Sequence, residues 1–251
     1  MALRVGVLGA KGQMGREVCL AVASAEDLDL VAEIDLGDSI DSLKSNMVDV
    51  VVDFTDPESV MTNLKYVIEN DIHAVVGTTG FDKSMMDTLK SLLSIHPNVG
   101  VLIAPNFGLG AVLMMQFAAT AARYFESAEI IELHHPEKMD APSGTATRTA
   151  ELMNEARSKE LFGAMPDKTN RALDGARGAR VGSVPVHSIR LRGLVAHQEV
   201  LFGAAGETLS IRHDSLNRSG FMPGVLLGIR EVIKNPGLTV GLENYLKLEK
   251  E

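Results

Sequence analysis

Leu3-Arg4-Val5-Gly6-Val7-Leu8-Gly9-Ala10-Lys11-Gly12-Gln13-Met14-Gly15, near the start of the chain, is the stretch that decides the fold. Its first six residues are mainly apolar and predict a short strand, and the run 16–24 that follows predicts a helix. The three glycines between strand and helix are spaced three and three, whereas the commoner dinucleotide fingerprint spaces them two and three. Either spacing permits a tight turn, close approach of a pyrophosphate and close packing of the helix on the strand. An ordinary tight turn is the alternative, and the strand before it and the helix after it disfavour that alternative.

The second predicted strand, residues 28–35, ends in the acidic residue Asp35. A dinucleotide-binding fold places its ribose-binding carboxylate about 20 residues after the last glycine of the turn, which is where Asp35 lies. Asp35 is preferred to Glu33 because the C-terminal end of a strand faces the ligand crevice. A carboxylate there repels a 2′-phosphate and favours NADH, while Lys11 could partly neutralise such a phosphate, so NADPH is disfavoured rather than excluded.

Strands and helices alternate up to residue 105, which predicts an α/β fold with a parallel sheet. The further strands are residues 49–55, 73–76 and 99–103, and a helix from Pro57 to about Asn70 follows the first of them. The last two strands end in Gly77-Thr78-Thr79-Gly80-Phe81 and Ala104-Pro105-Asn106-Phe107-Gly108. Such strand ends line the nicotinamide side of the crevice in doubly wound folds, so both loops are candidate cofactor contacts.

A second informative stretch, residues 130–147, carries groups suited to acid–base chemistry. Residues 129–135 alternate like a strand, which places Glu132 and His134 on one side and Leu133 and His135 on the other. Beyond Pro136 the chain must leave the strand. The turn that follows contains Lys138 and Asp140.

Ser143 is predicted as the N-cap of a helix over residues 146–159. The N-terminus of a helix offers unpaired N–H groups and the positive end of a dipole, which suit a carboxylate or phosphate. Residues 130–147 therefore predict a site for an anionic substrate that needs a proton. Three alternatives stay open: histidines with ordinary hydrogen-bonded roles, Ser143 as a cap alone, and a metal site built from Glu132, His134 and Asp140.

The C-terminal half predicts a different architecture. A helix over residues 109–125 precedes the second stretch, and alternating strands over 185–192, 196–202 and 207–213 predict an antiparallel meander. One face of such a sheet must be covered by helices or by another subunit, so an oligomer is expected. A final helix over residues 220–234 is expected to return to the first sheet.

Composition excludes several classes of protein. The 251 residues carry a formal net charge of −9, which argues against a nucleic-acid surface. No apolar run approaches the ~20 residues of a membrane span. The single cysteine, Cys19, excludes an internal disulfide and fits a reducing compartment, so a cytoplasmic protein is expected.

With these motifs in order, residues 5–241 resemble the 4-hydroxy-tetrahydrodipicolinate reductase (dihydrodipicolinate reductase) family, in the form found in high-GC Gram-positive bacteria. The glycine turn alone is not specific to that family. Glu132-Leu133-His134-His135, with Lys138 and Asp140-Ala141-Pro142-Ser143-Gly144-Thr145, is highly specific to it. A different amino-acid dehydrogenase of similar build, and a dinucleotide sensor without turnover, remain the competing functions.

The resemblance implies a Rossmann domain of residues 1–105, completed by 215–251, with an inserted α+β domain of 106–214 that binds substrate and builds a homotetramer. It implies hydride transfer from NADH or NADPH to a small cyclic dicarboxylate in lysine and diaminopimelate biosynthesis, without a metal. His134 and Lys138 would be catalytic, and substrate would contact His135, Ser143, Gly144 and Thr145. Cofactor would contact Gly9, Ala10, Lys11, Gly12, Gln13, Met14, Asp35, Gly77, Thr78, Thr79, Ala104, Pro105, Asn106 and Phe107. Members of the family often carry a second basic residue at the position of Gln13, so this chain is expected to use NADPH less well.

Overall fold

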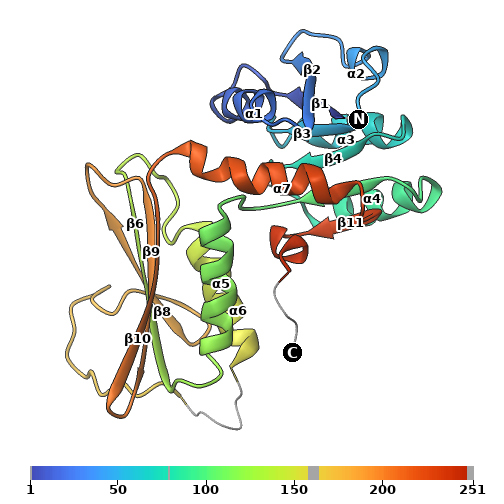
Figure 1. Ribbon diagram of the computed structural model, residues 1–251. Helices are drawn as coiled ribbons and strands as arrows, with labels where there is room; N and C mark the ends of the chain where they lie inside the picture. Colours follow the sequence, from blue (N-terminus) through green and yellow to red (C-terminus); the bar gives the residue numbers. More distant parts are fainter. Residues whose placement is uncertain (1, 79, 158–163, 248–251) are drawn as a thin grey trace. The chain divides into compact units, whose positions relative to one another are not determined.

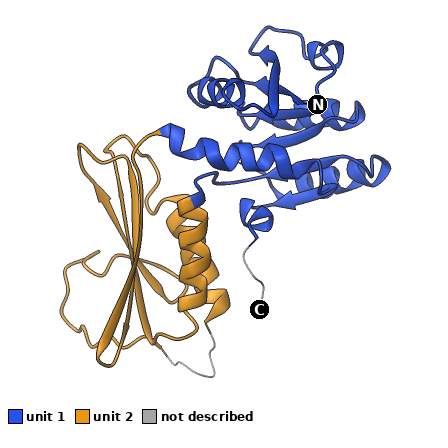
Figure 2. Ribbon diagram, viewed as in Figure 1, with its two compact units in different colours: residues 1–109, 218–251 blue, residues 110–217 orange. Residues whose placement is uncertain are grey.

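The computed structural model describes residues 2–78, 80–157 and 164–247, which form two compact units (Figures 1 and 2). Unit 1 consists of Met1–Leu109 and Arg218–Glu251, and unit 2 consists of Gly110–Asn217. The boundaries expected from the sequence were 105/106 and 214/215. Thr79 and the predicted helix end at Lys159 lie outside the described residues.

Unit 1 is built on a six-stranded sheet in the order β11-β5-β4-β3-β1-β2, and every neighbouring pair is parallel. The predicted Rossmann-type parallel sheet is therefore confirmed. Its inner strands are short and continuously buried, as expected of strands covered on both faces. The strands are β1 (Leu3–Leu8), β2 (Leu28–Ile34), β3 (Val50–Asp53), β4 (His73–Val76), β5 (Gly100–Ile103) and β11 (Gly237–Val240).

Helices cover both faces of this sheet. Buried leucines, valines and isoleucines of α3 and α4 join one core cluster with residues of β3, β4 and β5, while α7 contacts α1, β4 and β5. The helical segments of unit 1 are α1 (Gln13–Ala23), α2 (Ser42–Ser45), α3 (Val60–Glu69), α4 (Lys83–Ile95), η1 (Arg218–Phe221), α7 (Met222–Val232) and η2 (Leu242–Tyr245).

Several elements of unit 1 differ from the sequence-based expectation. Helix α3 begins at Val60 rather than at Pro57, and residues 57–59 form a turn in which the Asp56 carboxylate accepts hydrogen bonds from the N–H groups of Glu58 and Ser59, as the N-cap of a helix does. Helix α4 and strand β11 were not predicted. The N-cap of α4 is Asp82, whose carboxylate accepts from Met85 N at 2.8 Å, a signal that the sequence does contain.

Unit 2 contains a five-stranded mixed sheet in the order β10-β9-β6-β8-β7 and two helices, which Figure 1 shows on the same side of the sheet. The bounds are α5 (Leu109–Ala121), β6 (Ser127–His134), α6 (Gly144–Ala156), β7 (Ala179–Val181), β8 (Val184–Arg190), β9 (Ala196–Ala204) and β10 (Glu207–Ser215). Within the described residues, no helix of either unit is long and apolar enough to cross a bilayer.

The predicted antiparallel meander is wrong in one respect. Strands β9 and β10 pair as an antiparallel hairpin, but β8 pairs with β6 and β7 rather than with β9. Strand β6 lies between β8 and β9, parallel to the first and antiparallel to the second. Because β6 ends at His134, ahead of Pro136, the loop after β8 can pass its end, and Leu191 N donates a 3.0 Å hydrogen bond to His134 O.

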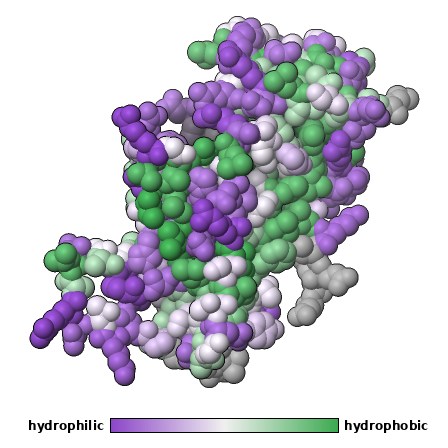
Figure 3. All heavy atoms as spheres, turned by 60° about the vertical axis from the view of Figure 1, so that its left-hand side comes forward, coloured by the Kyte–Doolittle hydropathy of each residue, from purple (hydrophilic) through white to green (hydrophobic). Residues whose placement is uncertain are grey.

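The two faces of the unit 2 sheet differ in burial. Ala128, Ile130 and Glu132 of β6 point to the face that α6 covers and are buried. The opposite face carries an apolar group made of Ile131, Leu133, Ile189 and Leu201, here called the open-face strip; Ile189 is 40% exposed. In Figure 3, which turns this side of unit 2 toward the viewer, hydrophobic and hydrophilic side chains lie next to one another.

Candidate active site

Unit 1 has a cavity of about 380 Å3 at the carboxyl ends of its strands. Gly9 lines it with φ +76, a conformation that favours glycine, and a Cβ at Gly9 would lie 2.8 Å from Phe54 O. At Gly15 a Cβ would lie 2.0 Å from Gly9 O, so this glycine lets α1 pack directly against the turn. The lining residues are Leu8, Gly9, Ile34, Asp35, Leu36, Gly37, Asp38, Ile40, Thr55, Asp56, Ser59 and Asn63.

Asp35 follows the last residue of β2 and faces this cavity. Its carboxylate accepts hydrogen bonds from Lys11 N at 2.7 Å and from Leu36 N at 2.9 Å. These bonds from Leu36 and Lys11 lower the pKa of Asp35, so the carboxylate is ionised at neutral pH. The Lys11 ammonium lies 3.5 Å from the Asp38 carboxylate, which leaves a net negative charge around the position expected for the ribose.

The predicted nicotinamide-side loops meet at the carboxyl ends of β3, β4 and β5. Thr78 Oγ1 donates to Thr55 O at 3.2 Å, and Ala104 N donates to Val76 O at 3.0 Å. Phe54 packs against Phe107 with ring centroids 5.6 Å apart, and its ring occupies the space that a Cβ at Gly77 would need. Pro105 is exposed, Asn106 Oδ1 accepts from Gly108 N at 2.8 Å, and Thr79 lies outside the described residues.

The first turn of α1 completes this arrangement. Helix α1 begins at Gln13 with Gly12 as its N-cap, and Gly12 makes no side-chain cap. The N–H groups of Gln13, Met14 and Gly15 therefore have no acceptor within the helix and can meet an anion. The tight turn, a cavity and an ionised carboxylate at the end of β2 together fit a nicotinamide dinucleotide.

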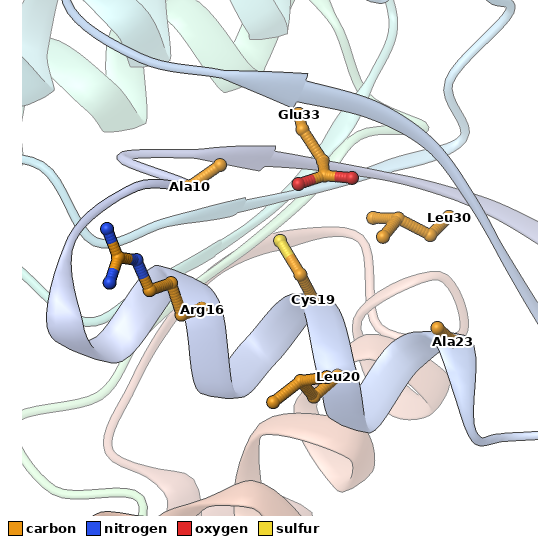
Figure 4. Close-up of a pocket in the computed structure, with 7 residues that line it drawn as sticks. All are labelled: Ala10, Arg16, Cys19, Leu20, Ala23, Leu30 and Glu33. Atoms are coloured by element: carbon orange, nitrogen blue, oxygen red, sulfur yellow. The ribbon is translucent and has the colours of Figure 1, made fainter.

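A separate hollow of about 430 Å3 lies between α1 and β2 and is largely apolar (Figure 4). Figure 4 shows the Cys19 thiol pointing toward the Glu33 carboxylate. Burial, reinforced by the charge of Glu33, raises the pKa of Cys19 to about 11, so the thiol stays protonated. Glu33 therefore lies in this hollow rather than in the cavity that Asp35 faces.

Unit 2 brings Glu132, His134 and Arg190 into one hydrogen-bonded cluster. Glu132 is completely buried, and its Oε2 lies 2.5 Å from His134 Nδ1. Arg190 donates from both terminal nitrogens to the two Glu132 oxygens at 2.9 Å each. The sequence predicts that Glu132 and His134 lie on one side of their strand, and in β6 they do. His135 follows the strand and is exposed.

Lys138 and the start of α6 lie on the segment that follows β6. Lys138 Nζ donates to Asp140 Oδ1 at 2.6 Å, and this hydrogen bond lowers the pKa of Asp140. Ser143 is the N-cap of α6, as the sequence predicts, and its Oγ accepts from Ala146 N at 3.2 Å. A Cβ at Gly144 would meet no atom within 4 Å, so the space beside the first turn is open, and Thr145 is half-buried.

The protonation states of the cluster follow from burial and neighbouring charges. Burial lowers the pKa of His134, which outweighs the opposing effect of Glu132, so the imidazole is mainly neutral at neutral pH. Burial raises the pKa of Glu132, but hydrogen bonds from Arg190, Ser188 and His134 outweigh it and the net shift is downward. Glu132 is therefore ionised although it is buried.

Other candidate residues have different partners. Arg177 pairs with Glu129 and Asp167, and Arg180 lies 3.9 Å from Asp167, so both are engaged on the open face rather than with His134. Among residues 2–78, 80–157 and 164–247, no group of three or more His, Cys, Asp or Glu side chains could hold a metal ion.

Sequence reasoning missed Arg190 and the Thr55–Asn63 side of the cofactor cavity. Arg190 lies 58 positions from Glu132, and no local pattern joins two residues so far apart. The signal that was available is Glu132 itself, since an acidic residue on an otherwise apolar strand face requires a buried partner.

The fold and the two sets of residues define a class of protein. A Rossmann-type unit that fits a nicotinamide dinucleotide, and a unit that carries a hydrogen-bonded Glu–His–Arg cluster suited to proton transfer, are typical of a nicotinamide-dependent oxidoreductase acting on an anionic substrate.

Comparisons with known proteins identify the family. The family model described as "Dihydrodipicolinate reductase, N-terminus" matches residues 3–107, and "Dihydrodipicolinate reductase, C-terminus" matches residues 110–246. The 4-hydroxy-tetrahydrodipicolinate reductase of Nocardia farcinica is 61% identical over 248 residues, covering 99% of this chain and 100% of that protein. The reductase of Streptomyces coelicolor is 58% identical over 246 residues, covering 98% of each chain.

A solved structure agrees with these relatives. Dihydrodipicolinate reductase from Paenisporosarcina sp. TG-14, with dipicolinate bound, is 37% identical and has a TM-score of 0.89, covering 98% of this chain and 100% of that chain. The chain belongs to the dihydrodipicolinate reductase family and is an NAD(P)H-dependent oxidoreductase. The family predicted from the sequence is thereby confirmed, including the high-GC Gram-positive form.

Proposed function

We propose that this chain reduces 4-hydroxy-tetrahydrodipicolinate to tetrahydrodipicolinate with NADH or NADPH, as a step of lysine and diaminopimelate biosynthesis. One observation carries the proposal: His134 is hydrogen-bonded to the buried Glu132 and lies within ten residues of both Lys138 and the N-terminus of α6. A relative that is 37% identical is described as bound to dipicolinate, a ring with two carboxylates, which supports a cyclic dicarboxylate as substrate here.

Cofactor binding is assigned to the glycine turn, Asp35 and the strand-end loops of unit 1. The N–H groups at the start of α1 would hold the pyrophosphate, and Asp35 would accept hydrogen bonds from the ribose. Gly77, Thr78 and Thr79, with Ala104, Pro105, Asn106 and Phe107, would border the nicotinamide. When bound, the reduced nicotinamide supplies a hydride to the substrate.

Proton delivery is assigned to His134 and Lys138. Hydride arriving at the ring leaves electron density that a proton must meet, and a positioned acid typically contributes 10²–10⁴-fold, about 3–5 kcal/mol. The Lys138 ammonium also attracts the dianionic substrate. A substrate carboxylate would bind Ser143, Gly144 and Thr145 at the first turn of α6, with His135 as a further contact.

Asp140 marks where that carboxylate would bind. In this structure the Asp140 carboxylate accepts from Lys138 Nζ at 2.6 Å, beside the start of α6. A carboxylate of the substrate would make the same ion pair with the Lys138 ammonium. The substrate would therefore replace Asp140 as the partner of Lys138. The open space beside Gly144 leaves room for it.

Substitution of Lys138 tests these roles. We expect Lys138→Ala to lower kcat by about two orders of magnitude or more, because both the donor and the charge are lost, while NADH binding is unchanged. Turnover is measured as loss of nicotinamide absorbance with the condensation product of pyruvate and aspartate semialdehyde, and NADH binding by fluorescence titration.

Lys65→Ala is the matched control, since Lys65 is an exposed lysine on α3 that pairs with Glu69. It should keep the parent kcat. A Lys138→Ala enzyme with near-normal kcat would remove Lys138 from the mechanism. A parent protein that binds NADH tightly without any turnover would favour the sensor function instead.

We also propose a homotetramer, in which the open-face strip of one chain is covered by another chain. A sheet face that carries four partly exposed aliphatic side chains supports such an interface. A cytoplasmic location is proposed as well, because a single cysteine suits a reducing compartment.

A further inference from the structure

Glu132 is a fully buried carboxylate on the covered face of the unit 2 sheet. The alternate residues Ala128 and Ile130 share this face of β6, and all three are buried. Its neighbours in register are Ser188 on β8 and Gln198 on β9. A carboxylate removed from water is unfavourable unless it is paired and hydrogen-bonded. Groups around Glu132 must therefore compensate its charge.

Arg190 provides this compensation and extends it to the loop. Two of its nitrogens bind the two Glu132 oxygens, and one of these nitrogens also donates to Asp140 O at 2.7 Å. The Ser143 N–H lies 3.3 Å from Glu132 Oε1. The Glu132–Arg190 pair thus binds the backbone of the segment between β6 and α6 at two points, Asp140 O and Ser143 N. This segment carries Lys138.

The bond between Glu132 and His134 determines where the imidazole holds its proton. An ionised carboxylate only accepts hydrogen bonds, so the proton in the 2.5 Å contact belongs to His134 Nδ1. A neutral imidazole in this tautomer has a lone pair on Nε2. Nε2 is therefore the nitrogen that can take up and release a proton.

Building on the proposed reduction, we propose that Glu132 and Arg190 are positioning residues that hold His134 as the Nδ1–H tautomer and reserve Nε2 for proton transfer to the substrate. A proton from solvent binds the Nε2 lone pair and forms an imidazolium, whose Nδ1–H remains on Glu132. Nε2 then gives this proton to the ring atom that gains electron density, and the imidazole returns to its neutral form.

The charges around His134 are few and come from identifiable elements. Glu132 on its own strand stabilises the imidazolium, while Arg190 on β8 and Lys138 on the following segment oppose it. Strand β9 contributes the uncharged Ala196 opposite His134. Removing the charge of Glu132 should therefore make His134 harder to protonate.

Strand β6 carries a matched control on its other face. Glu129 Oε2 lies 2.6 Å from His187 Nε2, and the same carboxylate pairs with Arg177. Glu129, His187 and Arg177 are the same residue types as the Glu132 cluster, and Glu129 lies on the same strand as Glu132, but none of the three is hydrogen-bonded to His134 in the structure. Glu129→Gln therefore makes the same chemical change without changing the proposed proton path.

The experiment compares Glu132→Gln with Glu129→Gln in the full-length enzyme. The pH dependence of kcat and of KM is measured with saturating NADH, and 15N NMR of the imidazoles, with His134 assigned by a His134→Gln variant, reports the tautomer. For Glu132→Gln we expect kcat to fall about tenfold to a hundredfold, with KM changed less than about threefold. The basic limb of the profile should move to lower pH, and the His134 nitrogen signals should shift. Glu129→Gln should keep the parent kcat, profile and His134 signals.

Two outcomes overturn the proposal: a Glu132→Gln enzyme with the parent pH profile and His134 signals, or an equal loss in Glu129→Gln. If Glu132→Gln does not fold because Arg190 is left unpaired, the double variant Glu132→Gln with Arg190→Gln removes both buried charges and is held to the same criteria. A parent enzyme without turnover would contradict the proposed function alone. The NMR tautomer of His134 would then still decide the positioning role.

Discussion

Asp35 faces the cofactor cavity with a carboxylate that two backbone N–H groups already orient. A carboxylate at this position favours NADH over NADPH. The Lys11 ammonium could neutralise a 2′-phosphate, but it lies 3.5 Å from the Asp38 carboxylate, and this pairing adds to the preference for NADH. Choice between NADH and NADPH therefore depends on a balance of exposed charges, which screening keeps modest. This argument predicts that both cofactors are used, with NADH preferred.

We expect Asp35→Asn to raise kcat/KM for NADPH by about tenfold or less, because it removes a repulsive charge that solvent partly screens. The measurement is steady-state kinetics with each cofactor at low and high salt, and the gain should shrink as salt is added. Asp29→Asn is the control, since Asp29 lies on β2, the strand that Asp35 follows, and pairs with Arg4. An unchanged cofactor ratio in Asp35→Asn would contradict the role of Asp35.

Individual site residues divide into those that the sequence could predict and those that it could not. His134, Lys138 and Ser143 lie within ten positions of one another, so strand alternation and helix capping place them together. Arg190 reaches Glu132 only because β8 is parallel to β6. The pairing of distant strands is not encoded in any local pattern, and the arginine was missed for that reason.

At the scale of elements, glycines set how closely helices approach strands. A Cβ at Gly224 of α7 would lie 1.9 Å from Phe107 O, at the loop that follows β5. Gly220 in η1 would meet nothing within 4 Å. The first glycine is therefore required by packing, and the second is not.

Gly224→Ala should destabilise the protein by about 2–3 kcal/mol, because α7 must move away from the backbone of Phe107. For a chain of this size that corresponds to a fall in Tm of roughly 4–12 °C. Differential scanning calorimetry of Gly224→Ala and of the control Gly220→Ala measures it. Equal Tm values for the two variants would show that the helix accommodates the extra methyl group.

Helices and strands could be predicted from the sequence where apolar residues form a continuous run or alternate with polar residues. The buried strands of unit 1 and the hairpin of β9 and β10 follow from apolar runs and from alternation. Helix α4 was missed although the sequence holds its signal: Met85, Met86, Leu89, Leu92 and Leu93 recur at helical spacing, and all five contribute to one core cluster. Strand β11 has four residues and pairs with β5, which is distant in the sequence. No local pattern in so short a segment predicts that pairing.

At the scale of the whole molecule, three histidines have a lowered pKa. Burial is the main cause for His73, His134 and His213. The unfolded chain then binds more protons than the folded one as pH falls through and below 6.5, the ordinary value for histidine. The contribution of these three neutral imidazoles to the free energy of unfolding is complete above that pH. It is lost as the pH falls through the lowered pKa values that the histidines have in the folded protein.

We therefore expect Tm to fall when the pH is lowered from about 7.5 to about 5.5, by roughly 2–4 °C for each kcal/mol lost. Calorimetry at constant ionic strength measures the trend. His73→Gln should flatten it, since a glutamine oxygen can still accept the Gly100 N–H that His73 Nδ1 accepts at 2.9 Å. A Tm that stays level or rises on acidification would contradict the assignment.

The open-face strip gives a prediction for assembly. Ile189→Asp should shift the protein from the proposed tetramer to smaller species, because a carboxylate cannot be buried against aliphatic side chains without a partner. Light scattering coupled to size-exclusion chromatography measures the mass. Ile95→Asp is the control, since Ile95 is an exposed aliphatic residue of unit 1. A tetramer that survives Ile189→Asp would place the interface elsewhere.

Unit 1 is assembled from two stretches of chain, and this has a consequence for synthesis on the ribosome. Strand β5 lacks its neighbour β11, and Val75 and Leu102 lack the cover of α7 at Gly228, until the last stretch has emerged. Unit 2 is continuous and can form all its strand pairs earlier. The part of the protein that is translated first is thus completed last, and during that interval an open strand edge is available to chaperones or to misassembly.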